Sequence, residues 1–324
     1  MQAKDTTLRK GRAVAGRVNR KARTAVRQWL DEPAATEAPP VEAEADEQVD
    51  ATTVLDLYTT EPPSPQLAID IFAGDWSSKF PDEFGITAGA ADLFEDARIT
   101  WLLELLGDVK GARVLELGPL EGGHTAMLDR AGAQVTAIES NSRAFLKCLV
   151  AKEVVGMTSA RFLRGDFTAY LEQSTDTFDF IVASGVLYHM KDPFRLLDLM
   201  AARSDRMLLW THYYDRDLLE AGGHGQRFEG AATDKVVHGT TYRLHPREYR
   251  DALGWGGFCG GNSESMNWIE RADLLGYLGQ LGYDRIEINF DSPDHINGPA
   301  LALFAERTAS APPAGTTDGL APAP

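Results

Sequence analysis

From residue 113 onward, short apolar segments alternate with segments that repeat apolar residues at helical spacing. Five buried strands are expected, at 113–117, 134–138, 160–164, 178–183 and 206–210. Helices are expected after Gly122 and at 142–155, 192–202 and 271–281. Strands that alternate with helices at this spacing form a parallel sheet with helices on both faces. This alternation restricts the fold more than any other feature of the chain.

Two further strands are expected near the end of the folded part, at 285–290 and 300–306. No helical segment separates them, and a parallel pair would need a crossover connection. We therefore expect an antiparallel pair at one edge of the sheet. The sequence predicts a Rossmann-like α/β domain over residues 111–306.

The segments around this domain differ from it in composition. Residues 1–30 predict a basic amphipathic helix, residues 31–66 an acidic disordered linker, residues 67–110 N-terminal helices that cap the core, and residues 307–324 a disordered tail. The basic helix could contact an anionic membrane surface or a partner protein. The interpretation we favour is a solvated extension that folds back on the acidic linker.

Composition excludes several classes of protein. The net charge of −16 opposes extensive non-specific binding of nucleic acid, which requires many Lys and Arg side chains. Cys148 and Cys259 are far apart, so we expect two free thiols in a reducing compartment, and no metal site. No apolar run is long enough to span a membrane, and the N-terminus lacks the apolar core of a secretory signal. We expect a cytoplasmic protein.

Chemically distinctive residues follow four successive strands, where ligands bind in open α/β sheets. Gly118 and Gly122 follow the first strand and permit a tight turn, and Glu116 precedes them. Glu139 follows the second strand. The third strand is followed by Asp166 and Phe167, and the fourth by Ser184 and Gly185. A carboxylate such as Glu139 can accept hydrogen bonds from ribose hydroxyls. Asp166 could accept the amine of an adenine that packs on Phe167, although an Asp in a loop is commonly a turn or cap residue. The set predicts a site for an adenosine-containing cofactor.

The Glu116-x-Gly118-x-x-x-Gly122 turn, Glu139 and the stretch "GVLYHMKDP" (185–193) resemble the class I S-adenosylmethionine-dependent methyltransferases. The resemblance covers roughly residues 90–306. It implies a seven-stranded sheet, mostly parallel with an antiparallel last strand, and S-adenosylmethionine as cofactor. The residues expected to hold the cofactor are Glu116, Gly118, Gly122, Glu139, Asp166, Phe167, Ser184 and Gly185.

Leu120 replaces the middle glycine that is common in the first turn of this family. A dinucleotide would place its pyrophosphate against that turn and need a glycine there. S-adenosylmethionine has no phosphate, so a side chain is tolerable. A dehydrogenase is also disfavoured because Tyr188 and Lys191 are three residues apart, not four.

Two histidines are placed to act as general base if the acceptor is a hydroxyl. His189 follows the fourth strand and His212 ends the fifth; each could equally be a structural residue. Residues 212–268 are too long for a plain connection and predict a substrate lid, although a disordered surface insertion is the alternative. The residues expected to contact the acceptor are Trp76, Tyr188, Tyr213 and Trp255.

The function that the sequence predicts is methyl transfer to a small-molecule or glycan acceptor, at oxygen. Two alternatives stay open. The stretch 185–193 is also similar to RNA-modifying members, including those that transfer a carboxymethyl group to tRNA. The chain could also be a methyltransferase-like binding module without catalytic activity.

Overall fold

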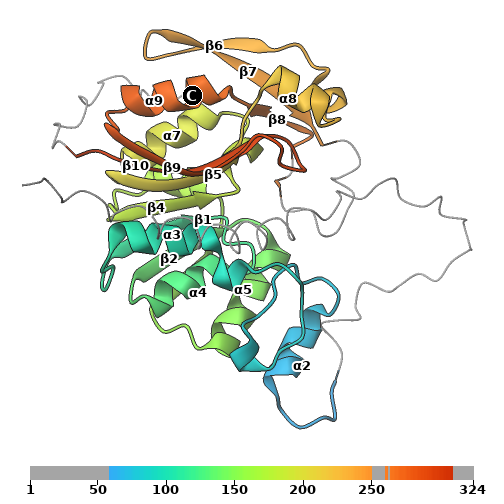
Figure 1. Ribbon diagram of the computed structural model, residues 1–324. Helices are drawn as coiled ribbons and strands as arrows, with labels where there is room; N and C mark the ends of the chain where they lie inside the picture. The colour runs from blue at the N-terminus through green and yellow to red at the C-terminus, as the bar shows by residue number, and fades with distance from the viewer. Residues whose placement is uncertain (1–57, 250–259, 262, 309–324) are drawn as a thin grey trace, which may run out of the picture.

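The computed structural model describes residues 58–249, 260–261 and 263–308. A central sheet has the strand order β3–β2–β1–β4–β5–β10–β9 (Figure 1). Its strands are β1 (Arg113–Leu117), β2 (Gln134–Glu139), β3 (Ala160–Arg164), β4 (Phe180–Ser184), β5 (Arg206–His212), β9 (Arg285–Ser292) and β10 (Ala300–Glu306). The first five are parallel, whereas β10 runs antiparallel to both β5 and β9. The predicted sheet with its antiparallel edge is confirmed.

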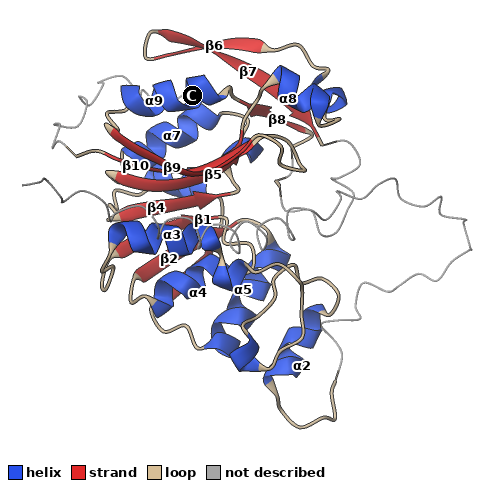
Figure 2. Cartoon of the chain, viewed as in Figure 1, coloured by secondary structure: helices blue, strands red, loops and turns tan. Residues whose placement is uncertain are grey.

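Helices cover both faces of this sheet (Figure 2). The α-helices are α2 (Pro65–Ile69), α3 (Ala97–Leu106), α4 (Gly123–Arg130), α5 (Ser142–Val155), α6 (Phe167–Gln173), α7 (Pro193–Ala201), α8 (Arg216–Ala221) and α9 (Arg271–Gln280). Short 3₁₀ turns occur at η1 (Asp70–Phe72), η2 (Asp82–Phe84), η3 (Leu93–Glu95), η4 (Leu187–His189) and η5 (Gly225–Phe228). Because side chains alternate along a strand, Val114 packs with α3, α4 and α5, and Leu115 packs with α6, α7 and α9.

Helix α5 has the same bounds as its sequence prediction, and its ends explain why. The Asn141 side chain accepts hydrogen bonds from the backbone N–H groups of Arg143 and Ala144, at 2.9 and 3.0 Å. At the other end, Gly156 adopts a left-handed conformation with φ of 73°. An Asn cap and a left-handed Gly are the standard signals for helix start and stop.

A second, antiparallel sheet lies within residues 212–268. It consists of β6 (Thr233–Val237), β7 (Thr240–Glu248) and β8 (Ser265–Trp268). Tyr242 of β7 packs on Phe194 of α7 and Tyr277 of α9, with ring centroids 4.6 and 5.4 Å apart, so this sheet covers the two helices (Figure 1). The described part of the predicted lid is thus a folded unit; its function as a lid stays a prediction.

The flanking segments are described only in part. The predicted basic helix at 1–30 lies outside the described residues, as do most of the linker and the tail beyond Thr308. Arg307, placed in the tail by the sequence prediction, instead donates to the carbonyl oxygen of Ser204 at 2.9 Å and pairs with Asp205 at 2.7 Å. Within the described ranges, no helix has the length and apolar character needed to cross a bilayer.

Gly123, the first residue of α4, offers a test of the packing between α4 and η3. A Cβ at this position would lie 2.6 Å from the backbone C and O of Leu93. We expect Gly123→Ala to lower the free energy of unfolding by roughly 1–3 kcal/mol, because the backbone must move, as measured by urea denaturation. The control is Gly276→Ala in α9, where nothing lies within 4 Å. It should stabilise by up to about 1 kcal/mol through helix propensity, and equal effects of the two changes would contradict this packing.

Candidate active site

The residues predicted to hold the cofactor lie at the carboxyl ends of the parallel strands β1 to β4. Backbone hydrogen bonds tie neighbouring strand ends together: Gly118 N–H donates to Ile138 O at 3.0 Å and Gly165 N–H to Glu139 O at 3.0 Å. Gly185 N–H donates to Trp210 O at 2.9 Å. Strand order reverses between β1 and β4, which is where open α/β sheets bind ligands.

The turn after β1 is built on left-handed backbone. Gly118 and Gly122 have φ of 64° and 81°, and a Cβ at Gly118 would lie 2.7 Å from Val186 Cγ1. The turn therefore packs directly on the loop after β4. Leu120 also has a positive φ, 56°, which costs a non-glycine residue roughly 1–2 kcal/mol. Leu120 thus adopts a left-handed conformation that ordinarily favours glycine.

Glu139 lies beside this turn at the end of β2. Its carboxylate is 5% exposed and accepts hydrogen bonds from the N–H groups of Leu120 at 3.2 Å and Asn141 at 2.8 Å. Burial raises the pKa of this carboxyl above its ordinary value, although the backbone N–H groups oppose the shift. Each carboxylate oxygen uses one of its lone pairs in these bonds and can accept a second donor. Glu139 therefore has the acceptor capacity that a ribose diol requires.

Glu116 begins a chain of buried charged groups. Its carboxylate accepts a hydrogen bond from the Thr125 hydroxyl and lies 3.9 Å from His124 Nδ1, and burial raises its pKa. The other ring nitrogen of His124 is 2.9 Å from Asp96, which pairs with Arg98 at 2.5 Å. Burial opposes ionisation of Asp96, but Arg98 and His124 together hold the pKa of its carboxyl well below the ordinary range. The ion pair is thus charged although both side chains are only 4% exposed.

Asp166 caps α6. Its Oδ1 accepts from the N–H groups of Thr168 at 2.7 Å and Ala169 at 3.2 Å. Asp166 is exposed and Phe167 is partly buried. The cap explains why an Asp occurs here, and recognition of adenine by the two residues stays a prediction.

The two predicted bases lie at the ends of β4 and β5. His212 Nδ1 is 2.9 Å from Gly298 O and 3.3 Å from Pro299 O, so Nδ1 carries the proton and Nε2 the lone pair. Burial lowers the pKa of His212 well below 6.5. His189 Nδ1 forms a hydrogen bond with the Tyr249 hydroxyl, and burial lowers its pKa to about 3, with a further contribution from Arg247. Both imidazoles are neutral at pH 7, the form that accepts a proton.

Aromatic rings surround these histidines. His212 stacks on Trp268 with ring centroids 4.9 Å apart, and Tyr188 lies 4.6 Å from His212 and 4.1 Å from His189. Trp210 lies 5.2 Å from His212, and the Arg98 guanidinium lies 4.7 Å from the Trp210 ring. The charged chain that starts at Glu116 therefore ends against this aromatic cluster.

Two of the residues predicted to contact the acceptor are buried away from the aromatic cluster. Trp76 is 7% exposed, donates from Nε1 to Ile69 O at 2.8 Å and packs on Phe80 in the core. Tyr213 is buried in the core cluster on the α9 side of the sheet. Tyr188 is in the aromatic cluster, and Trp255 lies outside the described residues. Contact of any of the four with substrate stays a prediction.

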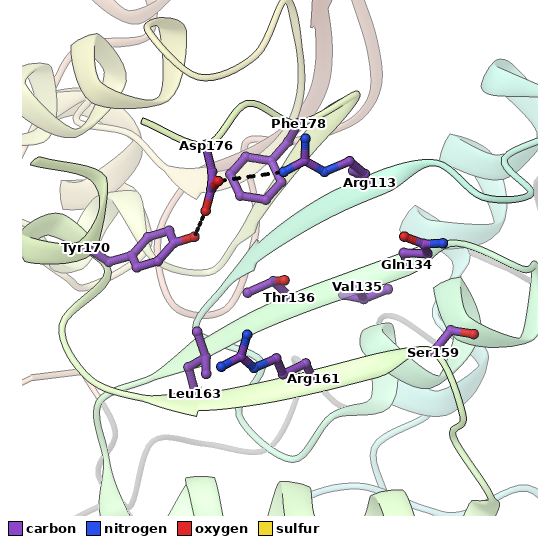
Figure 3. Close-up of a pocket in the computed structure, with 10 residues that line it drawn as sticks. All are labelled: Arg113, Gln134, Val135, Thr136, Ser159, Arg161, Leu163, Tyr170, Asp176 and Phe178. Atoms are coloured by element: carbon purple, nitrogen blue, oxygen red, sulfur yellow. Dashed lines mark hydrogen bonds and ion pairs between the residues drawn. The ribbon is translucent and has the colours of Figure 1, made fainter. Parts of the chain in front are cut away.

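A cavity of about 320 Å³ lies elsewhere, on the face of the sheet over β1 to β3 (Figure 3). Arg113 and Asp176, 3.8 Å apart, lie at its rim, and the Tyr170 hydroxyl donates to Asp176 at 3.0 Å. None of the predicted site residues lines it. Nor do His, Cys, Asp and Glu side chains gather in threes to hold a metal ion anywhere in the described ranges.

Comparison with known proteins gives a family and a fold. A family model described as a methyltransferase domain matches residues 91–287. The crystal structure of the N-terminal domain of EvdMO1, with S-adenosylhomocysteine and D-fucose, is 22% identical and has a TM-score of 0.52, covering 68% of this chain and 86% of that one. Magnesium protoporphyrin IX methyltransferase from Synechocystis PCC 6803 is 18% identical with a TM-score of 0.45, covering 65% and 80%. Ribosomal RNA small subunit methyltransferase A from Novosphingobium aromaticivorans is 47% identical over 51 residues, which is 16% of this chain and only 19% of that protein.

The buried Asp96–Arg98 pair supports a prediction about stability. Asp96→Asn should lower the free energy of unfolding by roughly 3–5 kcal/mol at pH 7, because it leaves the Arg98 charge buried without its partner. The difference in free energy of unfolding between the wild type and this variant should shrink as the pH drops below the ordinary Asp pKa of about 4. The reason is that the folded protein stabilises the ionised form of the Asp96 carboxyl. Urea denaturation at several pH values measures both effects. Asp82→Asn, which removes the exposed partner of Lys79, should leave stability nearly unchanged; a similar loss in both variants would refute this assignment.

Proposed function

The chain belongs to the class I S-adenosylmethionine-dependent methyltransferase family, and we propose that it transfers a methyl group to a small-molecule or glycan acceptor, at oxygen. The observation that supports this most is the buried Glu139 carboxylate beside the left-handed turn at 118–122. Glu139 ends β2, the neighbour of β1, and the strand order reverses on the other side of β1, between β1 and β4. Its carboxylate has acceptor capacity to spare. Cofactor and acceptor would meet above the ends of β1 and β4.

The residues around the turn fit S-adenosylmethionine. Glu139 would hold the ribose hydroxyls, and Glu116 the positively charged amino group. S-adenosylmethionine has no phosphate that must approach the turn between Gly118 and Gly122, so the Leu120 side chain in this turn is compatible with its binding. When bound, the cofactor supplies a methyl group on a positively charged sulfur, which is electrophilic without further activation.

The acceptor would lie against the aromatic cluster at the ends of β4 and β5. Methyl transfer depends chiefly on holding the acceptor in line with the methyl group, and rigid rings such as Tyr188 and Trp268 can do this. His212 would accept the proton of the acceptor hydroxyl at Nε2, because Nδ1 is held by the carbonyl groups of residues 298 and 299. His189 is the second candidate base.

A function on RNA is the second candidate, and the local match to a ribosomal RNA methyltransferase is the observation that favours it. The net charge of −16 opposes it. A gel shift with tRNA at increasing salt separates the two functions: salt-sensitive binding of tRNA would favour the RNA function.

A non-catalytic binding module is the remaining alternative, and it would bind S-adenosylhomocysteine without any turnover. We further propose that the protein acts in the cytoplasm and that residues 1–30 form a solvated extension. Liposome flotation of the full chain and of a variant lacking these residues would test this, because flotation that depends on residues 1–30 would favour contact with a membrane surface instead.

Binding of S-adenosylhomocysteine tests the cofactor site. Calorimetry should detect binding to the wild type, and Glu139→Gln should weaken it roughly ten- to a hundredfold, because a charged acceptor is replaced by a neutral amide. The matched control is Glu153→Gln, an exposed carboxylate on α5, which should bind like the wild type. Absence of binding by the wild type, or equal affinity in Glu139→Gln, would overturn the proposed cofactor site.

Measurement of kcat tests whether His212 and His189 act as general bases. Once a mass-spectrometric screen of cell extract has identified a methylated product, His212→Asn should reduce kcat by roughly 10²- to 10⁴-fold while S-adenosylhomocysteine affinity is retained. His189→Asn should have a smaller effect. Because burial keeps the His212 pKa well below 6.5, wild-type kcat should not fall as the pH is lowered from 8 to 6.5. Full activity in both variants would exclude an acid–base function for the two histidines.

A further inference from the structure

Arg247 places a positive charge at the acceptor side of the site. It lies on β7, opposite Met266 of β8. Its guanidinium carbon is 5.3 Å from the centre of the Trp268 ring and 5.4 Å from that of Tyr249. Trp268 in turn stacks on His212. The guanidinium is therefore one ring away from the proposed base.

No ion pair joins this cation to a carboxylate among the described residues. The groups that influence the Arg247 pKa are Arg227, Tyr249 and Tyr188, with no carboxylate among them. Burial lowers this pKa to about 10, so the group is still protonated at pH 7. By contrast, the buried Arg98 near the cluster has Asp96 at 2.5 Å. A partly buried cation with no counter-ion among the described residues is costly to the protein, and a ligand anion would compensate for it.

The surroundings reinforce the positive potential. Burial is the main cause of the low pKa of His189, His212 and His224, and the Arg247 charge lowers all three further. Arg227 contributes to the low pKa of His224 and Arg247. In a protein with a net charge of −16, Arg247 and Arg227 thus place two positive charges beside neutral histidines, where the acceptor is expected.

We propose that the acceptor is a small molecule bearing an oxyanion, a carboxylate or a phosphate, and that Arg247 binds this group beside the Trp268 ring. The inference rests on the proposed methyltransferase function and specifies its substrate class. A guanidinium suits this task because its planar N–H groups can bind two oxygens of one anion at once. Trp268 and Tyr249 would hold the guanidinium in place through their rings.

The experiment uses the full chain saturated with S-adenosylhomocysteine, so that cofactor binding is established before any acceptor analogue is added. Two matched series are titrated by calorimetry: D-glucuronate, D-glucose 6-phosphate and D-glucose, and then benzoate, phenyl phosphate and benzyl alcohol. In at least one series, an anionic member should bind about tenfold or more tightly than its neutral counterpart, with affinity that falls as salt is raised. The member that binds distinguishes a carboxylate from a phosphate acceptor.

Variants attribute this preference to the arginine. Arg247→Met should abolish it, Arg247→Lys should retain part of it, and Arg227→Met should weaken it less. The control is Arg195→Met, an exposed arginine on α7 that pairs with Glu172. All variants should keep their affinity for S-adenosylhomocysteine, which shows that they are folded.

The outcomes separate the two proposals. Failure of the wild type to bind S-adenosylhomocysteine overturns the proposed function. Cofactor binding with no preference for either anion, or a preference that survives Arg247→Met, overturns the oxyanion site alone. Arg247-dependent binding of tRNA in place of the small anions would also overturn it, because the charge would then serve nucleic acid.

Discussion

The parallel pairing of β1 with β2 on one side and with β4 on the other is the constraint on which the rest of the site depends. Connections through α4 and α5 run on one face of the sheet, and those through α6 and α7 run on the other. The loops after β1 and β4 therefore diverge, and the packing of Gly118 on Val186 fixes how close they come. Every predicted cofactor residue takes its position from this arrangement.

Buried charge links the two halves of the site. Glu116 faces the proposed cofactor position, and His124, Asp96 and Arg98 continue from it to the ring of Trp210 in the aromatic cluster. A charged group this deep is stable only when its partners are held in place, because desolvation would otherwise exceed the attraction. The segment before β1, which supplies Asp96 and Arg98, is thus part of the site's framework.

Much of the fold and the cofactor side could be predicted because it depends on local patterns. The bounds of β1, β3, β10 and α5 were predicted to the residue, since apolar periodicity, an Asn cap and a terminal glycine determine them. The strands β6 to β8 were missed because only scattered residues in them are buried, such as Tyr242, which packs on α7 and α9, and they leave no long apolar run in the sequence. The predicted contact of Trp76 with the acceptor rests on its place in the segment before the core. The structure adds that this residue is 7% exposed and packs on Phe80, and the contact itself stays a prediction.

The sequence by itself determined the sheet, its edge, the family and the row of residues along the carboxyl ends, because each of these follows from spacing along one strand or one turn. Only the tertiary structure decided the partners of the buried charges. Asp96 reaches His124 across 28 positions, and Arg247 meets Trp268 from a neighbouring strand. Contacts of this kind leave no periodic trace in a single sequence, since they depend on how separate elements pack.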